Sequence, residues 1–154
     1  MPSLKIVLLP ILILLAACGS RSTPPPTTVD TNAHACLSEA IYFEAGNTDD
    51  GRIAVGEVIL NRAADPRFPT SVCGVVDERT NGMCQFSYRC DGRTSAPKNP
   101  TTLALAQETA RELLGGGHNN LTSGALFFHA AAIAPGWFGT LTRLGQFGGN
   151  IFYR

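Results

Sequence analysis

Glu44 is an acidic side chain at a position where the surrounding pattern predicts an apolar one. The residues at helical spacing before it are Leu37, Ala40 and Ile41. In a helix that begins near Ala33, Glu44 therefore continues the apolar face. A carboxyl group packed against apolar side chains loses hydration in its charged form, which raises its pKa and keeps its proton available near neutral pH. The sequence thus predicts a general acid at Glu44, unless the helix ends early and the side chain reaches solvent.

A second polar feature lies in the predicted helix 52–63. Most of its residues are apolar, but Glu57 and Asn61 are spaced i, i+4 and share one face. They are expected to form a buried polar pair or to line a cleft; a narrow solvated strip is the alternative.

The cysteines indicate disulfides more strongly than a metal site. If Cys18 is modified, four remain, and an even number in an exported chain favours two disulfides with three possible pairings. None is spaced C-x-x-C and the histidines are scattered, so we expect no metal site. We also expect no organic cofactor, because the reaction that the family resemblance described below implies requires none. The four cysteines are Cys36, Cys73, Cys84 and Cys90, and the three histidines are His34, His118 and His129.

Cys84 and His129 offer a different chemistry. Together they could form the dyad of a thiol amidase or peptidase, because such partners need only be close in space. An oxidising compartment would tend to trap the thiol, which makes this interpretation the weaker one.

Residues 1–18 have the pattern of an export signal. Lys5 precedes the apolar run 6–17, which is short for a membrane span. The sequence 15–19, Leu-Ala-Ala-Cys-Gly, resembles the bacterial lipobox, which predicts lipidation at Cys18; an ordinary cleaved signal peptide is the alternative. In such lipoproteins, Gly19 in place of Asp favours the outer membrane, facing the periplasm, over the inner membrane.

The rest of the chain is predicted to be a tether and one domain. Residues 19–32 are rich in Ser, Thr and Pro, which is typical of an extended linker. Residues 33–154 are enough for one core. With twelve basic and twelve acidic residues and no long run of like charge, we expect no nucleic-acid partner, and we expect a monomer. Helices are predicted at 33–44, 52–63, 72–78 and 101–114, a long loop at 79–100, and short strands of an antiparallel sheet at 125–129, 141–147 and 151–153.

Motifs along the whole predicted domain resemble those of the SleB-type cell-wall hydrolases, the group that contains spore cortex-lytic enzymes. They occur in the same order and with similar spacing. The matching pieces are 41–45 (IYFEA), 51–55 (GRIAV), 60–62 (LNR), 65–69 (DPRFP), 72–76 (VCGVV), 84–87 (CQFS), 90–92 (CDG), 124–130 (GALFFHA) and 151–154 (IFYR).

The resemblance implies an α+β, lysozyme-like single domain, mainly helical, with a small antiparallel sheet and a glycan-binding groove. It implies cleavage of peptidoglycan between N-acetylmuramic acid and N-acetylglucosamine by lytic transglycosylation, with Glu44 as the catalytic acid. Substrate-binding residues expected to form hydrogen bonds or to stack on sugar rings are Tyr42, Asn61, Gln85, Phe86, Ser87 and Trp137.

The chain departs from the family pattern just after the acid. The family continues glutamate-alanine-arginine-glycine-glutamate, whereas this chain reads Glu44-Ala45-Gly46-Asn47. The arginine is missing and Asn47 stands in place of the second glutamate. A catalytically inactive peptidoglycan-binding lipoprotein is therefore an alternative, if that second carboxylate is required.

Overall fold

The computed structural model describes residues 30–96, 98–117, 120–133 and 136–154. The predicted signal peptide with Cys18, and the tether up to residue 29, lie outside the described residues. The helices are α1 (Thr31–Glu44), α2 (Asp49–Ala64), α3 (Val72–Val76) and α4 (Pro100–Leu114), with the short 3-10 helices η1 (Ser87–Arg89), η2 (Arg93–Ser95) and η3 (Gly136–Thr140). The strands are β1 (Arg79–Thr80), β2 (Met83–Cys84), β3 (Phe127–Ala130), β4 (Arg143–Phe147) and β5 (Asn150–Tyr153).

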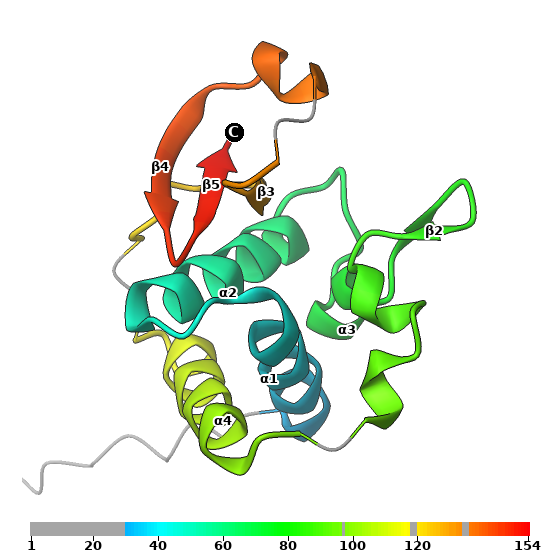
Figure 1. Ribbon diagram of the computed structural model, residues 1–154, viewed down its shortest axis with the longest axis vertical. Coiled ribbons are helices and arrows are strands. Elements are labelled where there is room, and N and C mark those ends of the chain that lie inside the picture. The colour runs from blue at the N-terminus through cyan, green and yellow to red at the C-terminus, as the bar shows by residue number, and fades with distance from the viewer. Residues whose placement is uncertain (1–29, 97, 118–119, 134–135) are drawn as a thin grey trace, which may run out of the picture.

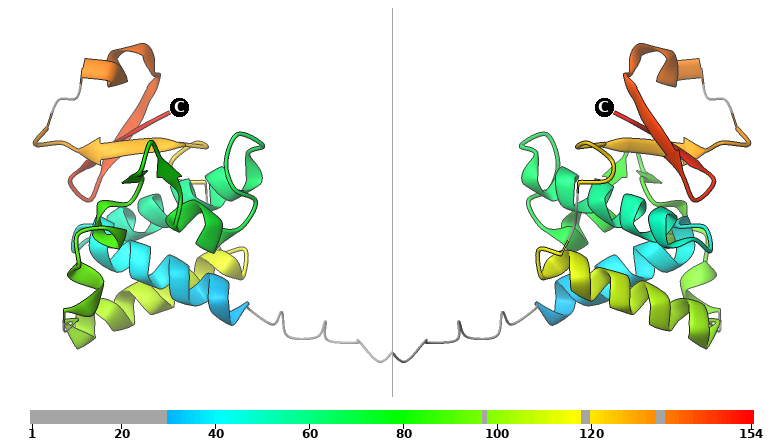
Figure 2. Two further views of the ribbon diagram at one scale, coloured as in Figure 1. Left: turned by 90° about the vertical axis from the view of Figure 1, so that its right-hand side faces the viewer. Right: turned by 90° about the vertical axis from the view of Figure 1, so that its left-hand side faces the viewer.

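The helices pack around one hydrophobic core, and the sheet of β3, β4 and β5 lies on the α2 side of the helical layer (Figures 1 and 2). Helix α1 packs against α2, α3 and α4, and it supplies Leu37, Ala40 and Ile41 to the core. These observations confirm the predicted fold class: a mainly helical domain with a small antiparallel sheet.

Polar side chains at their N-termini account for where the helices begin. Asp30 accepts the backbone N–H of Asn32 at 2.9 Å, so α1 begins at Thr31, two residues earlier than expected. Thr48 caps α2 and Asn99 caps α4 in the same way. Helix α1 extends through Glu44, as the apolar periodicity predicted.

The larger sheet is antiparallel in the order β3-β5-β4, so the last strand of the chain lies in the middle. Strands β4 and β5 are joined through Gly148 and Gly149, which both have positive φ, as a type I′ hairpin turn requires. This turn packs directly on the start of α2: a Cβ at Gly148 would lie 2.5 Å from the Cα of Gly51.

The segment 79–100 is more regular than the predicted loop. It begins with a hairpin of β1 and β2, whose turn residues Asn81 and Gly82 have positive φ, and continues through η1 and η2. The expectation of a structureless loop was therefore wrong in its first half, because Asn-Gly is a strong signal for a two-residue hairpin turn.

Two disulfides settle the pairing that the sequence left open. Cys36–Cys73 joins α1 to α3, and Cys84–Cys90 closes the short loop that contains residues 85–89. The prediction of two disulfides is confirmed.

No helix among the described residues is both long enough and apolar enough to cross a membrane.

Candidate active site

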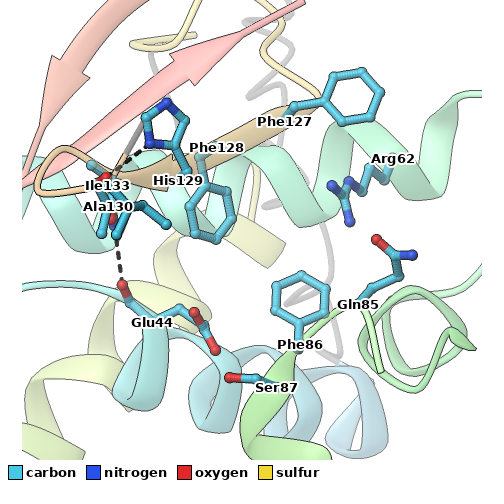
Figure 3. A pocket seen from close by; sticks show the side chains of 11 residues that line it. Glu44, Arg62, Gln85, Phe86, Ser87, Phe127, Phe128, His129, Ala130 and Ile133 are labelled. Atoms are coloured by element: carbon cyan, nitrogen blue, oxygen red, sulfur yellow. Dashed lines mark hydrogen bonds between the residues drawn. The ribbon is translucent and has the colours of Figure 1, made fainter. Parts of the chain in front are cut away.

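A cavity of about 450 Å³ lies between the helical layer and the sheet (Figure 3). Its walls come from the end of α1, the last turn of α2, the disulfide-closed loop, β3 and the first residue of β5. The residues that line it are Glu44, Arg62, Gln85, Phe86, Ser87, Phe127, Phe128, His129, Ala130, Ile133 and Asn150.

Glu44 is the last residue of α1, and its side chain points into this cavity (Figure 3). The Oε1 atom is buried and has no hydrogen-bond partner among the described residues. Burial is the main cause of a raised pKa for this carboxyl; the positive charge of Arg93 acts in the opposite direction, and the negative charge of Asp91 raises the pKa further. Glu44 therefore has the environment of a general acid.

The backbone around Glu44 is held from two sides. Asn150 donates its Nδ2 to the carbonyl oxygen of Glu44 at 3.1 Å, which ties α1 to β5. Ala45 has an extended backbone and ends the helix. A Cβ at Gly46 would collide with the carbonyl oxygen of Gly148, so the chain after Glu44 packs closely on the β4–β5 turn. The acid thus sits on a rigid support, as a catalytic group must.

The disulfide-closed loop brings three of the predicted residues to the same cavity. The Gln85 amide donates to the Thr80 hydroxyl at 2.8 Å, and the Ser87 hydroxyl accepts from Arg93 Nη2 at 3.0 Å. Phe86 is 2% exposed and forms part of the cavity wall. Side-chain oxygens of Gln85 and Ser87 are therefore held in position at the wall of the cavity.

Polar residues of α2 position the opposite wall, which is strand β3. The buried Glu57 carboxylate accepts the N–H groups of Leu121 and Thr122, both at 2.8 Å, and the Thr122 hydroxyl at 2.7 Å. Asn61 donates its amide to the carbonyl oxygen of Ala125 at 3.0 Å. The solvated strip is thus the wrong interpretation for Glu57; both residues dock the segment that leads into β3.

Two predicted substrate-binding residues, Tyr42 and Asn61, are not among those that line the cavity. The Tyr42 hydroxyl accepts the backbone N–H of Asn99 at 2.9 Å and connects α1 to the start of α4. Asn61 lines a separate depression on the surface. Trp137 belongs to η3, but its side chain is outside the described part of the structure.

The thiol chemistry proposed for Cys84 and His129 is excluded by the disulfide. Cys84 is bonded to Cys90, so it has no thiolate to offer. His129 Nδ1 lies 2.8 Å from the Ala130 carbonyl oxygen, and Nε2 lies 3.0 Å from the Tyr153 hydroxyl. The Cys-His amidase or peptidase alternative was therefore wrong.

Sequence reasoning missed Arg62 and Asn150 as cavity residues. Arg62 stood in the Leu-Asn-Arg motif, but only the fold shows that its side chain reaches the cavity. Asn150 depends on a contact with Glu44 across 106 positions. Within the described residues, no group of three His, Cys, Asp or Glu side chains is arranged to hold a metal ion.

Together these features define a mainly helical α+β domain with a desolvated glutamic acid in the cavity between its helices and its sheet. The comparison with protein families agrees: the model of the cell wall hydrolase family matches residues 46–153, and the chain belongs to this family. The match begins two residues after Glu44, so the geometry, not the family match, supports the assignment of that residue.

Curated relatives and solved structures are consistent with this membership. The chain is 31% identical over 117 residues to a spore cortex-lytic enzyme of Bacillus subtilis (75% of this chain, 35% of that protein). It is 28% identical over 135 residues to one of Oceanobacillus iheyensis (87% and 46%), so it spans less than half the length of these relatives. The catalytic domain of the germination-specific lytic transglycosylase SleB from Bacillus anthracis superposes with a TM-score of 0.64 at 26% identity, covering 84% of this chain and 100% of that one. The Bacillus cereus SleB catalytic domain gives 0.61 at 25% identity, with 88% and 100% covered.

Proposed function

We propose that this protein cleaves peptidoglycan glycan strands between N-acetylmuramic acid and N-acetylglucosamine, as a lytic transglycosylase with Glu44 as its single acid and base. The observation that carries the proposal is the position of Glu44. Its carboxyl group is half-buried at the cavity, its pKa is raised by desolvation, and no other acidic side chain lines the cavity among the described residues.

The reaction needs one carboxyl group in two roles. Protonated Glu44 donates its proton to the glycosidic oxygen as the bond from that oxygen to C1 of the muramic acid breaks. The resulting carboxylate then removes the proton from the 6-hydroxyl of the same sugar, and that oxygen bonds to C1 and closes a 1,6-anhydro ring. Glu44 regains its proton, and no enzyme nucleophile or water is consumed.

An ordinary glycosidase would need a second carboxylate, about 5 to 9.5 Å from the first. Asp91 is close enough to influence the pKa of Glu44, but it is exposed and accepts a hydrogen bond from Arg93 at 2.6 Å. Asn47, which replaces the family's second glutamate, is exposed and does not line the cavity. This arrangement favours the single-acid reaction, and it gives the inactive-binder alternative no specific support.

The walls of the cavity suggest how a glycan would be held. Gln85 and Ser87 offer oxygens to sugar hydroxyl and amide groups. Phe86 is 2% exposed, so its ring forms part of the wall behind them, and the predicted stacking of Phe86 on a sugar was wrong. Of the residues expected to bind substrate, Gln85 and Ser87 are retained in the proposal. A role for Trp137 remains a prediction.

The products distinguish this reaction from its rivals. Purified peptidoglycan incubated with the protein should release muropeptides with 1,6-anhydro ends, which mass spectrometry detects as lighter by one water than the hydrolytic products. New reducing ends would instead indicate a hydrolase, new amines an amidase, and sedimentation with peptidoglycan without any product a binding protein.

We also propose that the protein is an exported lipoprotein, with Cys18 lipidated and the domain at the outer membrane facing the periplasm. The tether is shorter than the predicted 19–32 and ends at residue 29, because Asp30 caps α1 and the helix begins at Thr31. The lipobox-like sequence supports this. Replacing Cys18 with Ser should move the protein from the membrane fraction to the soluble fraction. If a tether restrains the enzyme, release should increase lysis at equal export, and unchanged lysis would count against that restraint.

A further inference from the structure

Arg62 is a buried charge in the cavity wall that the proposed reaction does not use. It lies in the last turn of α2, is 7% exposed, and lines the same cavity as Glu44. In Figure 3 the two side chains lie at opposite ends of the cavity, with Phe86 and Phe128 between them. Of the described residues that line the cavity, no others are Asp, Glu, Lys or Arg.

The surroundings of Arg62 orient its guanidinium without neutralising it. Its Nε donates to the carbonyl oxygen of Leu126 at 2.7 Å. Its Cζ lies 5.1 to 5.7 Å from the ring centres of Phe68, Phe86 and Phe127, within the range of cation–π attraction. One hydrogen bond and three aromatic rings thus fix the orientation of the Arg62 guanidinium group.

Among the described residues, no carboxylate forms an ion pair with the terminal nitrogens of Arg62, although Glu78 lies nearby with a buried Oε2 that has no hydrogen-bond partner. Glu78 is close enough to raise the pKa of Arg62 against the larger, opposite effect of burial. No ion pair or hydrogen bond, however, joins these nitrogens to any residue in the described part of the chain. A desolvated cation without a paired anion is costly. The planar guanidinium of Arg62 can donate two parallel hydrogen bonds to one carboxylate. A ligand bound in the cavity can supply that carboxylate.

We propose that Arg62 binds a carboxylate on the muramic acid side of the substrate, at a fixed position relative to Glu44. This inference rests on the proposed function. The two sugars of the strand differ by the lactyl group of muramic acid, which bears a free carboxylate or a stem peptide with carboxylates of its own. Recognition of that anion determines which of the two alternating glycosidic bonds is placed beside Glu44.

The first test compares ligands and leaves Arg62 intact. The probes are a soluble tetrasaccharide of alternating N-acetylglucosamine and N-acetylmuramic acid with free lactyl carboxylates and the same tetrasaccharide as its methyl ester. Binding is measured by calorimetry with the purified Glu44→Gln protein, which prevents turnover. A fragment of the same length that carries stem peptides, with free or amidated carboxylates, forms the second pair.

The free acid should bind at least about tenfold more tightly than its neutral counterpart in one of the two pairs. A preference in the first pair assigns the lactyl carboxylate, and a preference in the second assigns the stem peptide. Equal affinities within both pairs would overturn the proposal. Such a result would leave the proposed reaction intact, because its anhydro products are measured separately.

The second test changes the residue. Arg62→Gln in the Glu44→Gln background should abolish the preference for the acid, and Arg62→Lys should restore part of it. Arg111→Gln removes an exposed cation of α4 that does not line the cavity and should keep the preference. The midpoint of thermal unfolding, measured for each variant, shows how much stability is lost with the hydrogen bond from Arg62 to the Leu126 carbonyl oxygen. A preference that survives Arg62→Gln would contradict the assignment.

Discussion

Asn150 binds the backbone of Glu44: its Nδ2 donates to the Glu44 carbonyl oxygen at 3.1 Å. The first residue of β5 thereby holds the last residue of α1, and both line the cavity. The bond joins the two layers of the fold at the point where the acid emerges from its helix. The position of the Glu44 carboxyl group, the proposed acid, consequently depends on the packing of the sheet against α1.

Asn150→Ala should therefore affect catalysis beyond its effect on folding. Loss of a buried hydrogen bond costs about 1 to 3 kcal/mol, and the end of α1 loses its anchor. We expect kcat to fall about tenfold or more, with a smaller change in KM, measured by release of soluble muropeptides. Asn99→Ala, which removes the N-cap of α4 at a cost of about 1 kcal/mol, is the stability control. Equal losses of activity in the two variants would show that Asn150 acts through stability alone.

Gly46→Ala should disturb the segment that follows Glu44, where it packs on the β4–β5 turn. The new methyl group would meet the carbonyl oxygen of Gly148, so the segment after Glu44 or the β4–β5 turn must shift. We expect a loss of about 1 to 3 kcal/mol in unfolding free energy and reduced activity. Gly139→Ala is the matched control, because a Cβ there has nothing within 4 Å. Unchanged unfolding by denaturant in Gly46→Ala would contradict the close packing.

The pH dependence should respond to Arg93 and Asp91 in opposite directions. Glu44 must be protonated to begin the reaction, so kcat/KM should fall as the pH rises through its pKa. Arg93 lowers that pKa and Asp91 raises it. Arg93→Gln should therefore move the alkaline limb of the profile to higher pH, and Asp91→Asn should move it to lower pH. Two shifts of the same sign, or no shift in either variant, would argue against Glu44 as the titrating acid.

The two disulfides should differ in what their removal does. Loop-closure entropy gives about 2 kcal/mol for Cys84–Cys90 and about 4 kcal/mol for Cys36–Cys73. Replacing Cys84 and Cys90 with Ser should lower activity several-fold, since this loop positions residues 85–87. Replacing Cys36 and Cys73 should cost more stability but leave kcat within about twofold under conditions where the protein is folded. Unchanged activity in the Cys84 and Cys90 double variant would contradict a positioning role for this disulfide.

The sequence was most informative where the signal is local. The apolar periodicity of α1 predicted both the helix and the inward position of Glu44, because one helical face must meet the core. The short strands of the sheet were also predicted from local patterns. The Asn81-Gly82 hairpin signal was present too, but the irregular residues that follow it obscured it.

Residues that depend on distant contacts could not be predicted in the same way. Asn61 was expected to bind substrate on account of its residue type, yet its partner is the Ala125 carbonyl, 64 positions away. Arg62, the next residue, reaches the cavity because its Nε binds the Leu126 carbonyl. Which of two adjacent polar residues faces the cavity is determined by how the 121–126 segment docks on α2, and no local pattern encodes that docking.

The most direct test of the account is mass spectrometry of the soluble products from purified peptidoglycan, with the wild-type protein beside Glu44→Gln. The wild-type protein should release anhydromuropeptides, and the variant, folded and still bound to peptidoglycan, should release none. Anhydromuropeptides at the wild-type rate from Glu44→Gln would contradict the assignment of the acid. No products from either folded protein would contradict the proposed reaction itself.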